Sequence, residues 1–353
     1  MTRLYGLQYL RGLAACAVVA YHAADRAQRP FTVGEAGVDL FFVLSGFLMW
    51  AITDADSRPG RFLADRVKRI VPIYWIVTSV MLAGALAGLF PAVRLSVAHV
   101  VTSYAFLPSV SPSNGQTWPL LVPGWTLNYE VGFYLLFGAA LCLPRAVQLG
   151  MLTAVLIALA AIHPLVGRDQ AALYFYSDPH ILEFLGGLWL AQLWRSPAFG
   201  HAATRGVLIA TTVALCALAL ALPPEWPKAL RYGLPALSAV ATILAFERRP
   251  GGIAELPALR LLGDASYSIY LWHTLALAVT AKVATTLHIA DAVAIPLHMV
   301  AGIGIGLIGY AGLEKPVMRY FHHRKRMAAA ALDARATAQG RATRLGSSPD
   351  VMK

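Results

Sequence analysis

Residues 4–24 read LYGLQYLRGLAACAVVAYHAA, an apolar run that contains one arginine, Arg11, and ends just after His22. A stretch of about 20 mostly apolar residues is long enough to cross a membrane as a helix. The composition agrees, because 58% of the 353 residues are hydrophobic and 13% are charged, against about 25% charged residues in an ordinary soluble domain. We therefore predict an all-α, polytopic membrane protein and exclude a disordered chain.

Similar apolar runs recur along the sequence and predict about ten transmembrane helices. They cover residues 4–24, 34–52, 70–90, 125–143, 146–166, 180–194, 206–222, 232–246, 262–287 and 293–313. The run at 95–107 is too short to cross, so we predict an interfacial or re-entrant helix there, followed by a long external loop over 108–124. Arg11 interrupts the first run, which argues against a cleaved signal peptide.

The charge balance bears on topology and partners. The chain has 29 Lys and Arg against 18 Asp and Glu, a net charge of +11. Most of the basic residues fall on one side of the predicted spans, so we predict that both termini are cytoplasmic and that nucleic acid is not a partner. We divide the chain into a transmembrane domain, 1–322, and a basic cytoplasmic tail, 323–353, which we expect to be partly disordered. The three cysteines lie in apolar runs, and we predict no metal site.

Arg11 and His22 are ionisable groups inside a predicted span, a costly placement that by default indicates function. They are eleven residues apart, which is about three helical turns or roughly 16 Å along one stripe of the helix. We expect Arg11 toward the cytoplasmic side and His22 near the external end. The alternative is that Arg11 extends to the membrane surface and His22 is an interfacial histidine.

Three carboxylates are predicted to lie near the external end of the same helix. Glu35 and Asp39 are four residues apart at the start of the second span, and Glu130 lies at the external side of the fourth. A carboxylate beside His22 would fix its tautomer and raise its basicity, as a general base requires. The alternative for Glu35 and Asp39 is that acids favour a helix N-terminus because of the helix dipole.

Two further groups of polar residues could bind ligands. Arg66 and Arg69, with Lys68 between them, follow the second span and are spaced three apart on a helical face, which suits phosphate recognition. The alternative is the ordinary excess of positive charge in cytoplasmic segments. In the ninth span Ser266, Tyr270 and His273 share one helical face, which serves either to line a substrate site or to form interhelical hydrogen bonds.

Five blocks of sequence, in this order, resemble the acyltransferase type-3 family of integral-membrane O-acyltransferases. The blocks are residues 10–22, 37–47 (which includes Ser45), 66–75, 125–130 and 262–273, with Glu314-Lys-Pro316 closing the last span. The resemblance covers residues 4–322. It implies about ten spans in a bacterial inner membrane and transfer of an acetyl group from cytoplasmic acetyl-CoA to a hydroxyl of a cell-surface or lipid-linked glycan. It also implies a short member without a soluble esterase-like domain.

The resemblance assigns roles to these residues. Arg11 and His22 fall on the family's arginine–histidine spacing, and Arg66 and Arg69 become CoA contacts, with Lys68 and Arg11 as further candidates. We expect His22 to act as general base, supported by Arg11 and by one of Glu35, Asp39 or Glu130. Ser45, Ser266, Tyr270 and His273 are candidate substrate-lining residues.

Other interpretations stay open. An acyl-His22 intermediate could replace direct transfer, and a glycan transporter or flippase would place the same charges along a path. A structural subunit is a third class, which the cost of an unused Arg11 argues against. Several aromatic residues either stack on sugar rings or form interfacial belts: Trp118, Trp125, Tyr174, Tyr176 and Trp226.

Overall fold

The computed structural model describes residues 4–29, 31–223 and 225–327, and within these ranges all regular structure is helical, with no strand. The α-helices are α1 (Tyr5–Arg26), α2 (Ala36–Ile52), α3 (Pro59–Leu86), α4 (Val97–Tyr104), α5 (Gly124–Ala140), α6 (Arg145–Ile162), α7 (Ala171–Ser177), α8 (Ile181–Trp194), α9 (Ala202–Ala221), α10 (Leu234–Glu247), α11 (Pro257–Thr286) and α12 (Asp291–Gly309). Short π-helical turns at Ala229–Gly233 and Tyr310–Glu314 precede α10 and follow α12.

The predicted all-α class is confirmed, and a helix lies in each of the ten segments predicted to be spans. The short run at 95–107 contains α4, and α7 was not predicted. Six stretches of the described chain are long and apolar enough to cross a membrane: Thr32–Ile52, Pro59–Leu86, Arg145–Leu165, Ala202–Ala221, Ala229–Glu247 and Asp291–Met327. These apolar helices indicate an integral membrane protein, while the count of ten spans and the orientation stay predictions.

One boundary differs from the sequence prediction in a way that matters for the site. The sequence analysis began the third span at residue 70, but α3 is one helix from Pro59 to Leu86. Proline fits the first turn of a helix because its missing N–H would have no partner there. Arg66 and Arg69 therefore project from a continuous, rigid helix.

Helix α2 packs against α8 with their backbones in contact. A Cβ atom at Gly46 would collide with the carbonyl oxygen of Phe184, and one at Gly187 would collide with that of Val43. Small residues at such crossings let two helices approach closely enough to gain dense van der Waals packing, which replaces the hydrophobic effect inside a membrane. These glycines therefore fix where α2 lies, and α2 carries several of the candidate residues.

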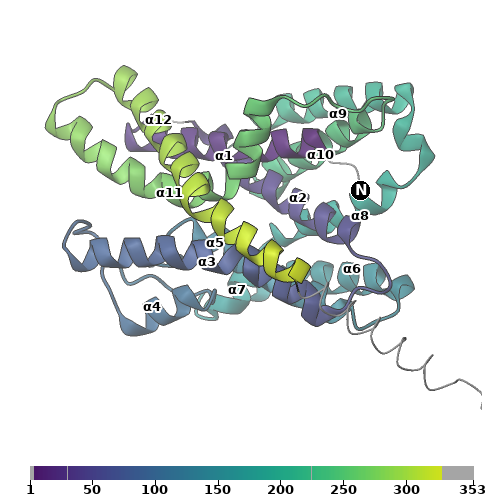
Figure 1. The fold of residues 1–353 in the computed structure, drawn as a ribbon, viewed down its shortest axis with the longest axis horizontal. Coiled ribbons are helices and arrows are strands. Elements are labelled where there is room, and N and C mark those ends of the chain that lie inside the picture. The colour runs from purple at the N-terminus through teal and green to yellow at the C-terminus, as the bar shows by residue number, and fades with distance from the viewer. Residues whose placement is uncertain (1–3, 30, 224, 328–353) are drawn as a thin grey trace, which may run out of the picture.

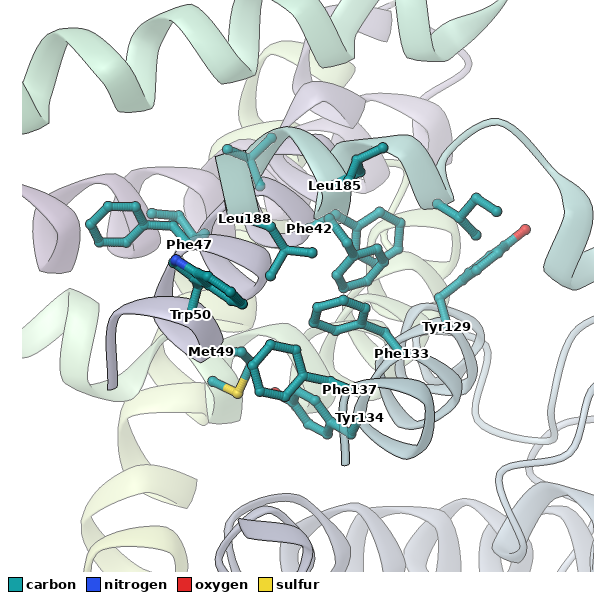
Figure 2. Packing of buried hydrophobic residues seen from close by; sticks show 14 of the residues in the cluster. Phe42, Phe47, Met49, Trp50, Tyr129, Phe133, Tyr134, Phe137, Leu185 and Leu188 are labelled. Atoms are coloured by element: carbon teal, nitrogen blue, oxygen red, sulfur yellow. The ribbon is translucent and has the colours of Figure 1, made fainter. Parts of the chain in front are cut away.

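Aromatic side chains fill the space between α2, α5 and α8 (Figure 2). The ring of Phe184 stacks on Phe42 with centroids 4.6 Å apart and on Phe133 with centroids 4.5 Å apart. Stacked rings of this kind add about 1 kcal/mol each beyond the area they bury. The cluster makes the three helices one rigid unit beside the site.

The end of the chain returns across the molecule. After α12 and its π-helical turn, the helix continues to Met327 and runs diagonally across the view toward α6 (Figure 1). Lys325 Nζ lies 2.9 Å from Asp65 Oδ2 on α3. Of the predicted tail 323–353, residues 323–327 continue this helix, and 328–353 lie outside the described residues.

Candidate active site

A cavity lies between α1, α2, α3, α5 and α11 and encloses about 850 Å³, including the space at its mouth. Its wall brings together residues from all five sequence blocks. The residues that line it are Arg11, Val38, Phe41, Phe42, Leu44, Ser45, Leu48, Met49, Arg66, Arg69, Ile70, Thr126, Leu127, Glu130, Tyr134, Ser266, Tyr267 and Tyr270.

The acidic group of this cavity is Glu130 on α5. Tyr134, one turn further along the same helix, donates a short hydrogen bond to Glu130 Oε1, and Ser45 Oγ on α2 donates to the same oxygen over 3.3 Å. Two hydroxyl donors on one oxygen hold the carboxylate in a fixed position. The sequence analysis missed Tyr134, although its i+4 spacing from Glu130 is a detectable signal.

Three arginines give the cavity its positive charge. Arg69 Nη1 lies 2.9 Å from Glu314 Oε1, and Ser268 Oγ donates to the other Glu314 oxygen over 2.6 Å. The Glu314 side chain is fully buried, so this ion pair is shielded from water on one side. Arg11 lies within electrostatic range of Arg69, Glu314 and Glu130. The cavity thus places cationic groups from α1 and α3 against one carboxylate on α5.

Arg66 is the arginine with a free donor. Its guanidinium carbon lies 5.9 Å from the ring centroid of Phe62 and 6.0 Å from that of Tyr134. Its Nε is buried and has no hydrogen-bond partner among the residues that the structure describes. A buried donor without a partner is costly, so a bound anionic ligand would relieve that cost.

A second hollow opens beside the first at the turn between α2 and α3, and Arg66 and Phe62 border it. Arg58, Arg61 and Asp65 also line this hollow. Arg58 and Arg61 were not among the candidates of the sequence analysis. Their spacing from Arg66 was visible in the sequence, whereas the hollow that they share required the fold.

His22 lies beyond the cavity wall and contacts it through two other rings. The His22 ring centroid is 5.2 Å from that of His273, which is 5.9 Å from that of the cavity residue Tyr270. His273 Nδ1 donates to the backbone carbonyl of Tyr270 over 2.7 Å. Its Nε2 is buried and finds no partner within the described chain. Since the carbonyl can only accept, Nδ1 carries the hydrogen.

Tyr270 has a hydrogen to offer inside the cavity. Thr126 Oγ1 donates to the Tyr270 hydroxyl oxygen over 2.9 Å. Thr126 has one hydroxyl hydrogen, which the carbonyl oxygen of Pro123 also accepts over 3.1 Å. Whenever Thr126 donates to Tyr270, the Tyr270 hydrogen is available for another acceptor. An oxygen atom that gains negative charge in the cavity would be such an acceptor.

The two acids at the start of α2 have different partners. Glu35 Oε1 lies 2.7 Å from Lys228 Nζ and is within electrostatic range of His22. Asp39 lies instead in a cluster with His180 and Glu183. One carboxylate oxygen of each acid and one ring nitrogen of His180 all lie within 4.8 Å of one another. The predicted neighbourhood of His22 therefore fits Glu35 better than Asp39.

This second cluster includes a further carboxylate. Asp178 Oδ1 accepts a hydrogen bond from His180 Nδ1 over 2.5 Å. Burial alone would raise the pKa of Asp178, but the hydrogen bond and the charge of His180 outweigh burial and hold the pKa below its ordinary value. Glu183 lies inside a predicted span and, by the rule applied to Glu130, was a candidate that the sequence analysis passed over.

The remaining candidates lie outside the cavity. Lys68 is half-buried on α3 but is not part of the cavity wall. Trp125 packs edge-on against Phe42 and Tyr129, and Trp226 is exposed. Neither tryptophan lines the space that holds the arginines.

Several known proteins resemble this chain over most of its length. Residues 4–313 match the sequence model of a family described as an acyltransferase domain. The exopolysaccharide production protein ExoZ of Rhizobium meliloti (strain 1021) is 42% identical over 85% of this chain and 94% of that protein. The putative membrane-bound transacylase BcsY of Komagataeibacter xylinus is 29% identical over 75% of this chain and 70% of that protein.

A more distant relative is longer. The peptidoglycan O-acetyltransferase OatA of Listeria monocytogenes is 27% identical over 75% of this chain, and the match spans 48% of that protein. No solved structure matches this chain.

Proposed function

The chain belongs to the acyltransferase family and is an O-acetyltransferase, and from this premise we propose that it acetylates a glycan with acetyl-CoA as donor. The acceptor is a hydroxyl of a cell-surface or lipid-linked sugar, as the names of ExoZ and OatA suggest. The main support is the cavity, where residues from five separated blocks meet. We place the protein in a bacterial inner membrane with both termini in the cytoplasm.

The donor end of the site is formed by arginines of α3. The second hollow, which we call the outer hollow, is bordered by Arg58, Arg61 and Arg66. The wall of the cavity includes Arg66 and Arg69. Guanidinium groups bind phosphate oxygens through paired, charge-assisted hydrogen bonds. In our proposal the nucleotide phosphates of acetyl-CoA lie in the outer hollow, and the uncharged pantetheine arm enters the cavity.

The acyl group then lies between Arg11 and the histidines. His22 removes the proton from the acceptor hydroxyl, whose oxygen attacks the thioester carbonyl and forms the ester bond. The carbon–sulfur bond breaks, and CoA leaves as a thiol after His22 returns the proton. Tyr270 donates its free hydrogen to the oxyanion in between, while Glu35 and Glu130 offset the positive charge that His22 acquires.

The donor assignment is tested with purified protein, radiolabelled acetyl-CoA and a membrane glycan extract. We expect Arg66→Ala and Arg69→Ala to raise the KM for acetyl-CoA by about tenfold or more, since each lost charge-assisted hydrogen bond contributes about 1.5–3 kcal/mol. Arg260→Ala is a matched control, because Arg260 pairs with Glu255 away from the cavity. Unchanged KM values for both cavity variants would remove the arginines from the donor site.

The assignment of His22 is tested by kcat. His22→Ala should lower kcat by about 10²-fold or more, which is the usual contribution of a positioned general base, whereas the exposed His201→Ala should leave it unchanged. Full activity of His22→Ala would exclude His22 as the base. Rapid-quench mass analysis with acetyl-CoA alone tests the alternative chemistry, since an acetylated His22 peptide would replace direct transfer by a covalent intermediate.

The class of protein and its orientation need separate measurements. A glycan transporter would neither bind nor hydrolyse acetyl-CoA, so binding of acetyl-CoA to the purified protein distinguishes an enzyme from a transporter. Labelling of single cysteines introduced at Asp65 and Asp169 from either side of the membrane tests the topology. We expect reagent from the cytoplasmic side to reach position 65 and reagent from the external side to reach position 169.

A further inference from the structure

Three polar side chains meet at the start of α2 and α8, away from the cavity lining. The three residues are Asp39 on α2, His180 just before α8, and Glu183 on α8. Each contributes one carboxylate oxygen or ring nitrogen, and these three atoms all lie within 4.8 Å of one another. Asp39 is 3% exposed and Glu183 is 6% exposed. The cluster is thus formed by buried groups rather than by acids on a solvated surface.

The buried oxygens of this cluster lack donors. Asp39 Oδ1 and both Glu183 oxygens have no donor among the described residues, and the two carboxyl groups lie within hydrogen-bonding range of each other. Lys228, the basic residue near by, is paired with Glu35. A buried carboxylate without a donor or a counter-charge costs several kcal/mol. The negative charge must therefore be offset by a bound cation, by a proton shared between Asp39 and Glu183, or by a second proton on His180.

His180 is held in the form that a metal ligand requires. Its Nδ1 donates to Asp178 Oδ1, and an ionised carboxylate can only accept, so the hydrogen is on Nδ1. The other ring nitrogen, Nε2, then carries no hydrogen in the neutral ring and can serve as a metal ligand. A carboxylate behind the imidazole is the usual companion of a metal-bound histidine, because it fixes the tautomer and raises the basicity of the ligand nitrogen.

We propose that Asp39, His180 and Glu183 bind a divalent transition-metal ion, such as Zn²⁺, that joins the start of α2 to the start of α8. Two carboxylates and one imidazole are a ligand set that suits Zn²⁺ and leaves a fourth position for water. Metal–ligand bonds of about 2.0–2.2 Å place ligand atoms roughly 3.3 Å apart, so the three side chains close by less than about 1 Å each on binding.

The backbone around the cluster leaves room for this arrangement. A Cβ atom at Gly233, in the π-helical turn before α10, would lie 2.9 Å from Glu183 Oε1. Glycine at this position therefore keeps the Glu183 carboxylate from being displaced. π-helical turns of this kind occur often at functional sites. The ion would act as a structural clip between α2 and α8.

The test measures metal content and thermal stability of the full chain in detergent. We expect about one equivalent of metal after purification without chelator, loss of that metal with a chelator, and a melting temperature that falls by about 5 °C and recovers with added Zn²⁺. Asp39→Asn and Glu183→Gln should weaken Zn²⁺ binding at least about 100-fold. Asp178→Asn should weaken it about 10- to 100-fold, because it removes only the support of His180.

Two comparisons keep the proposal falsifiable if a variant does not fold. Chelation of the wild-type protein needs no substitution, and Asp169→Asn is a control acid in the loop before α7 that should bind Zn²⁺ as tightly as wild type. Metal below about 0.1 equivalent, together with no response of the melting temperature to Zn²⁺, would overturn the proposal in favour of a shared proton. Equal Zn²⁺ affinity in wild type and Glu183→Gln would also overturn it.

Discussion

Replacing Glu314 by glutamine should destabilise the protein through Arg69 while leaving the shape of the side chain unchanged. Glu314 is fully buried and joins Arg69 on α3 to Ser268 on α11. Glutamine can still accept the hydrogen bond from Ser268, so the substitution removes mainly the charge. Breaking one side of a buried ion pair costs about 3–5 kcal/mol.

The two halves of this pair are not equivalent. The Arg69 side chain is 28% exposed, whereas the Glu314 side chain is 0% exposed. Water can solvate the arginine left behind by Glu314→Gln, so we expect a cost of about 2 kcal/mol, below the range for a fully buried pair. Arg69→Gln leaves an unpaired carboxylate without water, so it should cost about 3–5 kcal/mol.

Denaturant unfolding in detergent micelles measures these free energies for wild type, both single variants and the double variant. The double variant removes both charges at once, so its loss should fall short of the sum of the single losses by about 2 kcal/mol. Additive losses would show that the two groups do not interact. A cost for Glu314→Gln larger than for Arg69→Gln would contradict the argument from exposure.

Three other substitutions give distinct outcomes. Tyr134→Phe removes a hydrogen-bond donor to Glu130. It should lower kcat for acetyl transfer about tenfold with little change in KM. An unchanged kcat would argue against a catalytic role for this hydrogen bond to Glu130. Gly46→Ala drives a methyl group into the Phe184 backbone. It should lower the free energy of unfolding by about 3 kcal/mol or more, which size-exclusion chromatography would detect as aggregation. A monodisperse, stable variant would refute the contact. Lys228→Ala breaks a half-exposed ion pair and should change stability by less than about 1 kcal/mol in the same unfolding assay.

The positions of the helices were predictable because each one carries a long apolar run that nothing else explains. The first run, with Arg11 inside it, is the clearest example. Helix α7 was missed because it has only seven residues, too few to show a helical period. The start of α3 was missed because the apolar run begins only near residue 70, while the backbone of the charged residues before it continues the same helix.

Part of the candidate site was predictable, because a charged side chain inside an apolar span must face the interior of the helix bundle or a polar cavity. Arg11 and Glu130 were identified in this way, whereas Arg66 and Arg69 were identified by their spacing on one helical face. All four meet in one cavity. Their pairing was not predictable: Glu314 meets Arg69 from 245 positions away, through a π-helical turn with no sequence signal.

The same limit separated the two acids of α2. The sequence placed Asp39 and Glu35 together on one helical face, but it could not show that Asp39 meets a cluster built on α8. Spacing within one helix defines a shared face only approximately. Which neighbouring helix occupies that face depends on packing between segments distant in the chain.

The contact between Gly46 and Gly187 also decides which wall of the cavity can yield to admit a substrate. With backbone against backbone, α2 can neither slide along α8 nor turn about its own axis without opening a void in the membrane interior. We therefore expect access where α3 meets α11, whose backbones approach each other at far fewer positions than those of α2 and α8. A disulfide engineered between α2 and α8 should leave turnover intact, and one engineered between α3 and α11 should stop it. The reverse result would make α2 the moving part.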